Sequence, residues 1–143
     1  MLHERQRFSP ARRRIAQLLP LALMLLIFGL SSISIDLTAP KAGALGWVPP
    51  RLQNFLHIPL YGLLTFLWFG ALAAWGIGAR RRLPLAALIA LGYGLFDEWY
   101  QLSVPGRFGS LTDVALNVVG ILLALLFCHW FQQRFWSSST KTE

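Results

Sequence analysis

The chain alternates between long apolar runs and short polar connections, and this alternation predicts its architecture. Residues 15–35, 52–79 and 114–133 contain no Lys, Arg, Asp or Glu. Each run is longer than the roughly 18 residues that a membrane-spanning helix needs. The sequence therefore predicts an all-α integral membrane protein with a single membrane domain at residues 15–134.

A further helix is predicted at residues 83–96, although this charge-free run is too short to cross a membrane by itself. We expect the helix to continue as far as Gln101, because Pro105 is the first residue beyond it that would end a helix. Asp97 and Glu98 then lie inside the helix, near its end. With this extension the domain has four transmembrane helices.

Two signals predict where the second and fourth helices begin. Proline is tolerated in the first turn of a straight helix, so Pro59 predicts a start between Asn54 and His57, or a kink there. Ser110 and Asp113 have the spacing of a capping box, which predicts the start of the fourth helix.

The first apolar run has an alternative interpretation as a cleaved signal peptide. A basic start precedes it, and Ala42-Gly43-Ala44 resembles a peptidase site. A retained helix is favoured, because the run is longer than the apolar core of a signal peptide and the small residues fall well past its end.

Positive charges predict the orientation of the domain. The formal net charge of +7 comes from short clusters between apolar runs, a pattern typical of membrane topology and not of nucleic-acid binding. Of the 13 Lys and Arg residues, only Lys41, Arg51 and Arg107 fall on the side opposite the termini. Because cytoplasmic segments carry the excess of positive charge, residues 1–14 are predicted to be a basic cytoplasmic segment and residues 135–143 a polar cytoplasmic tail.

In this orientation, polar residues gather at the outer ends of the second, third and fourth helices. Spacings of three or four residues give them shared helical faces. Gln101 is spaced to lie beside either Asp97 or Glu98, and the turn at Pro105 directs Arg107 towards the cluster. The candidate site residues are His57, Tyr61, Asp97, Glu98, Gln101, Arg107, Asp113 and Asn117.

These residue types favour chemistry on an anionic group. A histidine beside a carboxylate is suited to general-base or nucleophilic catalysis. Arginine offers a planar fork for phosphate or carboxylate, and the amino termini of helices add partial positive charge. The cluster therefore predicts a site for an anionic head group.

Structural roles are open for the same residues. Asp113 and Ser110 are able to cap their helix together. Arg107 is able to hold helix ends together through an ion pair with Glu98 or Asp113. His57 is also open to a role as an interfacial histidine bonded to the backbone.

Metal and cysteine chemistry have little support in the sequence. A metal site of His57, Glu98 and Asp113 is disfavoured, because no pair of these ligands has the spacing of a metal motif. No metal is predicted, and no particular cofactor is indicated. Cys128, the single cysteine, is predicted to be a small buried hydrophobe, and Tyr61 fits packing better than catalysis.

The segments HIPLYGLL and DEWYQLSVPGRFGSLTDVALNVVG resemble the VanZ-like membrane proteins over residues 54–120. The signature of that family is a histidine with a tyrosine four residues on, then Asp-Glu-x-x-Gln, a Gly-Arg turn and Asp-x-x-x-Asn-x-x-Gly. Many members carry Asp-Lys just before the histidine region, where this chain has Gln53 and Asn54. The matching residues are His57, Tyr61, Asp97, Glu98, Gln101, Gly106, Arg107, Asp113, Asn117 and Gly120.

The resemblance implies a multi-pass protein of the bacterial plasma membrane, and the charge distribution predicts that both termini lie in the cytoplasm. It implies membrane lipids as partners and a contribution to resistance to glycopeptides such as teicoplanin. From the residues and the resemblance together, we predict a hydrolase or transferase acting on a phospholipid or a polyprenyl-linked envelope precursor. The predicted catalytic residues are His57, Asp97, Glu98 and Asp113, and the predicted substrate-binding residues are Tyr61, Gln101, Arg107 and Asn117.

Two other functions stay open. The cluster is equally able to hold an anionic lipid or an amphiphilic antibiotic without chemistry. A small transporter subunit fits less well, because the centres of the predicted helices are apolar. The sequence leaves the oligomeric state undefined.

Overall fold

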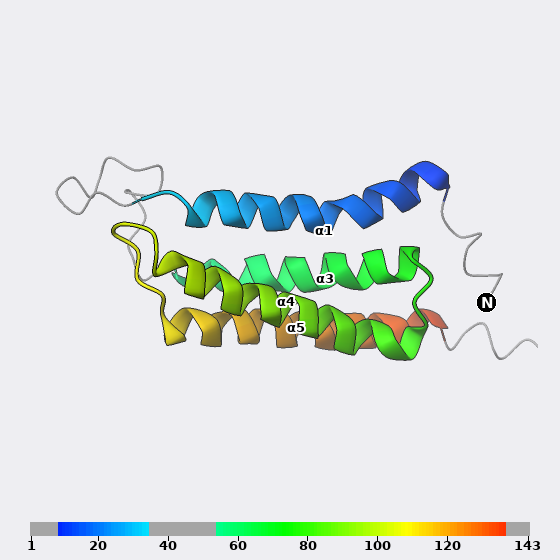
Figure 1. Ribbon diagram of the computed structural model, residues 1–143. Coiled ribbons are helices and arrows are strands. Elements are labelled where there is room, and N and C mark those ends of the chain that lie inside the picture. The colour runs from blue at the N-terminus through cyan, green and yellow to red at the C-terminus, as the bar shows by residue number, and fades with distance from the viewer. Residues whose placement is uncertain (1–8, 35–53, 137–143) are drawn as a thin grey trace, which may run out of the picture.

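The described part of the chain is built from helices alone. The computed structural model describes residues 9–34 and 54–136. Within these residues the elements are α1 (Pro10–Ser31), α3 (His57–Ala74), α4 (Ala79–Gln101) and α5 (Leu111–Trp136). The helices lie side by side, and each runs opposite to the one before it in this order (Figure 1). The all-helical prediction is confirmed for these residues.

Some of the predictions fall on residues that the structure does not describe. The basic segment at 1–14 is described only from residue 9, and the polar tail at 135–143 only to residue 136. Ala42-Gly43-Ala44, the signal for a cleaved leader, also lies outside the described residues.

The helices α1, α3 and α5 are long and apolar enough to cross a membrane, α5 over Leu111–Arg134. The 23 residues of α4 give a length of about 35 Å at about 1.5 Å per residue, which is sufficient for a span. α4 differs from the other helices in carrying more charged residues, which are Arg80, Arg81, Arg82, Asp97 and Glu98. Its passage across the membrane therefore stays a prediction.

In α4 the usual distribution of side chains is reversed, with polar residues inside and apolar residues outside. Its exposed large side chains include Leu88, Leu95, Phe96 and Trp99. Its buried polar and charged side chains are Arg82, Asp97, Glu98 and Gln101. The polar face packs within the bundle, where α4 contacts α3 and α5. This distribution is expected for a helix whose surroundings are lipid.

The starts of α3 and α5 agree with the sequence signals. α3 begins at His57, which places Pro59 in its first turn, where a proline leaves no hydrogen bond unmade. α5 begins at Leu111, and the hydroxyl of Ser110 accepts a hydrogen bond of 3.1 Å from the backbone N–H of Thr112. Ser110 therefore caps the helix, as a residue just before a helix often does.

Glycines allow α3 and α5 to pack very closely near the site. A Cβ added at Gly62 would lie 3.2 Å from the carbonyl oxygen of Gly120. A Cβ added at Gly120 would overlap the carbonyl oxygen of Ile58. Gly120 thus permits a close approach of the two helices, and this crossing fixes the distance between the helices that carry His57 and Asn117.

Contacts along its length join α1 to α4. The Tyr93 hydroxyl donates to the carbonyl oxygen of Met24 at 2.5 Å. Nearer the site, the rings of Phe28 and Tyr100 lie 4.7 Å apart between centroids, and the Tyr100 hydroxyl is 3.1 Å from the hydroxyl of Ser32.

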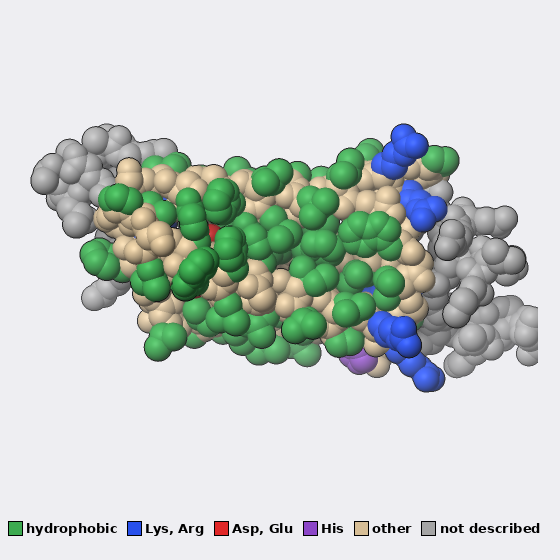
Figure 2. All heavy atoms as spheres, in the orientation of Figure 1, with side chains coloured by type: hydrophobic (Ala, Val, Ile, Leu, Met, Phe, Trp, Pro, Cys, Tyr) green, Lys and Arg blue, Asp and Glu red, His purple; other side chains and the backbone are tan. Residues whose placement is uncertain are grey.

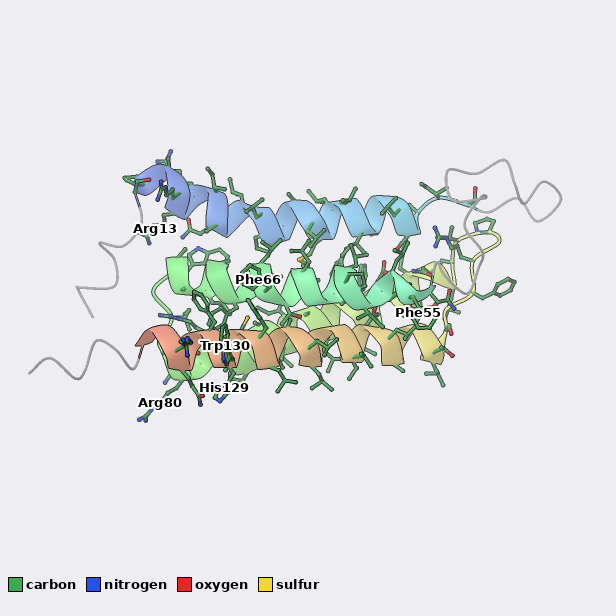
Figure 3. All side chains as sticks on the ribbon, turned by 180° about the vertical axis from the view of Figure 1, so that it is seen from behind. Arg13, Phe55, Phe66, Arg80, His129 and Trp130 are labelled. Carbon is green, nitrogen blue, oxygen red and sulfur yellow. The ribbon has the colours of Figure 1, made fainter. Side chains whose placement is uncertain are left out.

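The two ends of the bundle differ in charge. On the face seen in Figure 2, hydrophobic side chains cover the middle of the molecule, and most of the visible Lys and Arg atoms lie at the end where α1 begins. Arg13 and Arg80 lie at that end and Phe55 lies at the other (Figure 3). Cys128 is buried, with 1% of its surface exposed, as predicted.

Candidate functional site

A pocket of about 400 Å³ lies at the end of the bundle where α1 and α4 finish and α3 and α5 begin. Its volume is within the range of small-molecule sites. The pocket is lined on its polar side by His57, Tyr61, Asp97, Gln101, Arg107 and Asp113. The remaining predicted residues, Glu98 and Asn117, are buried directly beside His57. The structure thus brings all eight predicted site residues together.

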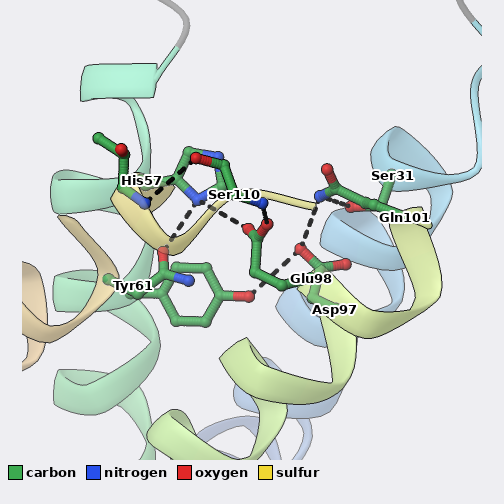
Figure 4. A network of polar contacts seen from close by, with 9 residues as sticks. Ser31, His57, Tyr61, Asp97, Glu98, Gln101 and Ser110 are labelled. Atoms are coloured by element: carbon green, nitrogen blue, oxygen red, sulfur yellow. Dashed lines mark hydrogen bonds and ion pairs between the residues drawn. The ribbon is translucent and has the colours of Figure 1, made fainter. Parts of the chain in front are cut away.

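His57, the first residue of α3, is held between two other helices (Figure 4). Its Nδ1 atom lies 2.9 Å from Oδ1 of Asn117 on α5 and 3.9 Å from Oε1 of Glu98 on α4. The amide oxygen accepts a hydrogen bond from Nδ1–H, while the carboxylate favours a positively charged ring. Among the described residues, the contacts of its Nδ1 atom are with side chains.

Glu98 connects α4 to the start of α5. Its Oε2 accepts a 2.9 Å hydrogen bond from the backbone N–H of Ser110, and its side chain is buried. In a capping box, the side chain of Asp113 would accept the hydrogen bond from the backbone N–H of Ser110. Because Glu98 does so instead, the interpretation of Asp113 as a capping partner of Ser110 is wrong. Asp113 is buried and its Oδ1 has no hydrogen-bond partner within the described chain.

Asp97 forms a second group of contacts, with the neighbouring helices α3 and α1. Its Oδ2 accepts hydrogen bonds from the Tyr61 hydroxyl at 3.4 Å and from the Gln101 amide at 3.3 Å. The same amide also lies 3.3 Å from the hydroxyl of Ser31. Of the two carboxylates that the spacing leaves open to Gln101, the structure places Asp97 beside it, in the i, i+4 relation.

Both adjacent carboxylates face the interior. Asp97 is 2% exposed and Glu98 is 5% exposed. A helix turns by about 100° per residue, so burying both requires protein on two sides of α4. Asp97 lies among groups of α1 and α3, while Glu98 contacts His57 and Ser110. Of the two, Asp97 lines the pocket, whereas Glu98 is buried beside His57.

Arg107 closes the end of α1. Its Nη2 donates to the carbonyl oxygen of Leu30 at 2.7 Å and its Nε to that of Ile33 at 3.2 Å. A cation at this position stabilises the carboxyl end of a helix. Gly106, with φ of 76°, forms the turn before it. Within the described residues Arg107 makes no ion pair with Glu98 or Asp113, so that alternative is not supported.

Tyr61 belongs to the polar cluster and is also packed in the core. It is fully buried, its ring is parallel to that of His57 at 6.2 Å between centroids, and its hydroxyl reaches Asp97. Packing and participation in the polar network therefore coincide in this residue.

The sequence analysis missed the part that α1 plays. The site was expected at the ends of three helices, but Ser31 bonds to Gln101, and Ile27 and Leu30 form part of the pocket wall. The only signal was the pair of serines at the end of the first apolar run. Hydroxyl groups at a helix end are too common to predict a site.

One group of side chains has the composition of a metal site. Donor atoms of His57, Glu98 and Asp113 all lie within 4.8 Å of one another. The three residues are far apart in sequence and come together only through the packing of α3, α4 and α5. Spacing along the chain was therefore a poor guide to whether they could share a ligand.

The fold and the site define a helical membrane protein with a buried cluster of acids and a histidine at one end of its bundle. The family model described as VanZ/LLP1 matches residues 2–132, so the chain belongs to the VanZ-like family. No curated protein matches the chain significantly, and neither does any solved structure.

Proposed function

We propose that the protein is a membrane enzyme, a hydrolase or transferase, that acts on phosphate-bearing lipid head groups at the outer leaflet of the bacterial plasma membrane. The observation that carries this proposal is the position of His57 at the wall of the pocket, 3.9 Å from the buried Glu98 carboxylate and 2.9 Å from Asn117. A histidine so placed is able to transfer protons or attack an electrophile.

The lining of the pocket supports an amphiphilic substrate. On one side it presents Ile27, Leu30 and Leu60, and on another Asp97 and Gln101. A lipid has the matching division between an apolar chain and a polar head group. Both a phospholipid and a polyprenyl-linked envelope precursor meet this description, and action on the latter would link the protein to glycopeptide resistance.

In the proposed reaction His57 accepts the proton of an attacking water or hydroxyl as the new O–P bond forms. It returns that proton to the leaving oxygen as the old P–O bond breaks. Glu98 stabilises the charged ring, and Asn117 fixes its orientation. Arg107 and Gln101, which both line the pocket, are the proposed head-group ligands.

The test is a comparison of whole-cell lipid extracts by mass spectrometry. Cells express the wild type, His57→Ala, Arg107→Ala or the control His129→Ala at matched membrane levels. His129 is exposed and bonds to Gln133 within α5, away from the pocket. We expect a head-group or lipid-carrier species to change with the wild type and the control, and to revert in the other two variants.

An unchanged lipid profile in all cells would contradict the enzymatic proposal. The second candidate is a binding protein without chemistry, which is favoured by the hydrogen bond between Nδ1 of His57 and Asn117, because a histidine engaged in this way can be purely structural. In that case the purified wild type would carry a lipid that Arg107→Ala loses and His129→Ala retains.

A further inference from the structure

The site buries more negative charge than the surrounding groups neutralise. Asp97, Glu98 and Asp113 are 2%, 5% and 7% exposed. Among the described residues only His57 forms a contact of under 4 Å with one of these carboxylates as a group able to carry positive charge, and it is charged only when protonated. Arg107 directs its guanidinium to backbone carbonyls of α1. Unpaired buried carboxylates are very costly, so this arrangement needs protons or a cation.

The unused hydrogen-bonding capacity of the cluster identifies where a cation would fit. Oε1 of Glu98 and Oδ1 of Asp113 are buried and have no hydrogen-bond partner within the described chain. Both oxygens are acceptors and cannot satisfy each other. Nδ1 of His57 lies 3.9 Å from the first of them. An imidazole nitrogen and two carboxylate oxygens form a common ligand set for divalent transition metals.

The distances agree with this use. Atoms that bind one metal ion at about 2.0–2.2 Å lie about 3.0–3.6 Å from one another. The donor atoms of His57, Glu98 and Asp113 are within 4.8 Å of one another. Side-chain movements of less than about 1 Å at each atom would therefore complete the coordination. Oδ1 of Asn117, next to Nδ1, is in position to serve as a further oxygen ligand.

We propose that His57, Glu98 and Asp113 bind one divalent transition-metal ion, Zn²⁺ or Mn²⁺, at the base of the pocket. Three protein ligands leave a coordination position open, as in catalytic metal sites. Asp97 remains outside the ligand set: its Oδ1 is also without a hydrogen-bond partner among the described residues, but its donor atoms do not fall within the group of close donors that His57, Glu98 and Asp113 form. Ser110 supports the site by holding Glu98 through its backbone N–H.

Metal binding itself does not depend on the proposed substrate. If the proposed function is correct, the ion would give the site a means of binding the phosphate of the substrate. A cluster of carboxylates repels a phosphate, whereas a metal ion held by them attracts a phosphate oxygen and polarises it. With its Nδ1 deprotonated and bound to the ion, His57 would give up its hydrogen bond to Asn117 and act as a ligand in place of the base described above.

The test measures metal binding directly on the full-length, untagged protein purified in detergent. The protein is stripped with a chelator and titrated with Zn²⁺ by calorimetry, and bound metal is counted by elemental analysis. We expect one Zn²⁺ per chain for the wild type and for His129→Ala. We expect His57→Ala and Asp113→Asn to weaken binding by about 10-fold to 100-fold or more.

Folding of each variant is checked by size exclusion and thermal unfolding, and Glu98→Gln replaces any variant that does not fold. Absence of Zn²⁺ binding by the folded wild type would overturn the inference, as would equal affinity in the wild type and the ligand variants. The lipid comparison is a separate measurement, so a failure of the proposed function leaves the metal result standing, and the reverse is also true.

Discussion

At the scale of residues, sequence spacing predicted which side chains gather but not which ones bond. Gln101 lies three residues after Glu98 and four after Asp97, and both relations bring side chains together on a helix. Gln101 bonds to Asp97 because of contacts with other helices: Tyr61 bonds to Asp97, and Ser31 bonds to Gln101. Such contacts across helices are set by packing, which no single helix encodes.

Arg107 gives the same lesson about charge. Its sequence neighbours favour an ion pair, yet within the described residues its guanidinium donates to the carbonyl oxygens of Leu30 and Ile33. The end of a helix presents carbonyl groups without partners in the helix itself, and these are as attractive to a guanidinium as a carboxylate is. The position of the end of α1 relative to the turn at Gly106 could not be read from the sequence.

The first prediction concerns the bond between Glu98 and Ser110. Glu98→Ala leaves the buried N–H of Ser110 without an acceptor, so we expect the free energy of unfolding to fall by about 1–3 kcal/mol relative to Glu98→Gln. The glutamine keeps an oxygen for that N–H while removing the charge. Thermal unfolding in detergent measures the difference, and equal stability of the two variants would show that the bond contributes nothing.

At the scale of helices, the residues at which helices begin were predicted more accurately than which helices contact one another. Pro59 marked the first turn of α3 and Ser110 the residue before α5, because backbone geometry and capping are local effects. α1 begins at Pro10, five residues before its apolar run, with Ser9 as its cap. The apolar pattern identifies the part of a helix within a membrane and not its continuation beyond it.

The second prediction concerns the crossing of α3 and α5. Gly120→Ala places a methyl group against the carbonyl oxygen of Ile58, and we expect a loss of about 1–3 kcal/mol in the free energy of unfolding. Gly70→Ala on α3 is the matched control, because a Cβ there meets no atom within 4 Å. We expect this control to be neutral or more stable, as alanine favours helix.

Unfolding midpoints of the two variants in the same detergent test this difference. If Gly120→Ala were as stable as Gly70→Ala, the close packing of these helices would not hold in the folded protein. Loss of the lipid activity in Gly120→Ala with normal folding would instead show that the crossing controls the distance between His57 and Asn117.

At the scale of the whole molecule, charge divides the bundle into two ends with an apolar middle. Arg13 and Arg80 lie at one end, and the acidic cluster lies at the other (Figure 3, Figure 4). The positive-inside rule assigns the first end to the cytoplasm. The site would then open towards the outer leaflet. This orientation stays a prediction, which depends on counts of charges and not on contacts.

The third prediction tests this orientation and the passage of α4 together. The variant Phe108→Cys replaces a side chain that is 74% exposed and lies at the same end of the bundle as the site. The variant Arg80→Cys changes a residue at the opposite end of α4. We expect a membrane-impermeant thiol reagent to label Phe108→Cys in intact cells, and Arg80→Cys only after permeabilisation. The wild type, whose Cys128 is buried, provides the background.

Labelling of Arg80→Cys but not Phe108→Cys in intact cells would reverse the proposed orientation. Labelling of both would show that α4 does not cross the membrane as a helix of 23 residues.

The reversed side-chain distribution of α4 has a consequence for biogenesis. A helix that carries Arg82, Asp97 and Glu98 enters a bilayer poorly by itself, since each charge adds a large transfer free energy. In the finished bundle these side chains are buried against neighbouring helices. Insertion of α4 is therefore expected to coincide with its docking onto α3, synthesised before it, and to be completed when α5 follows. For this helix, entry into the membrane and assembly of the site become a single event.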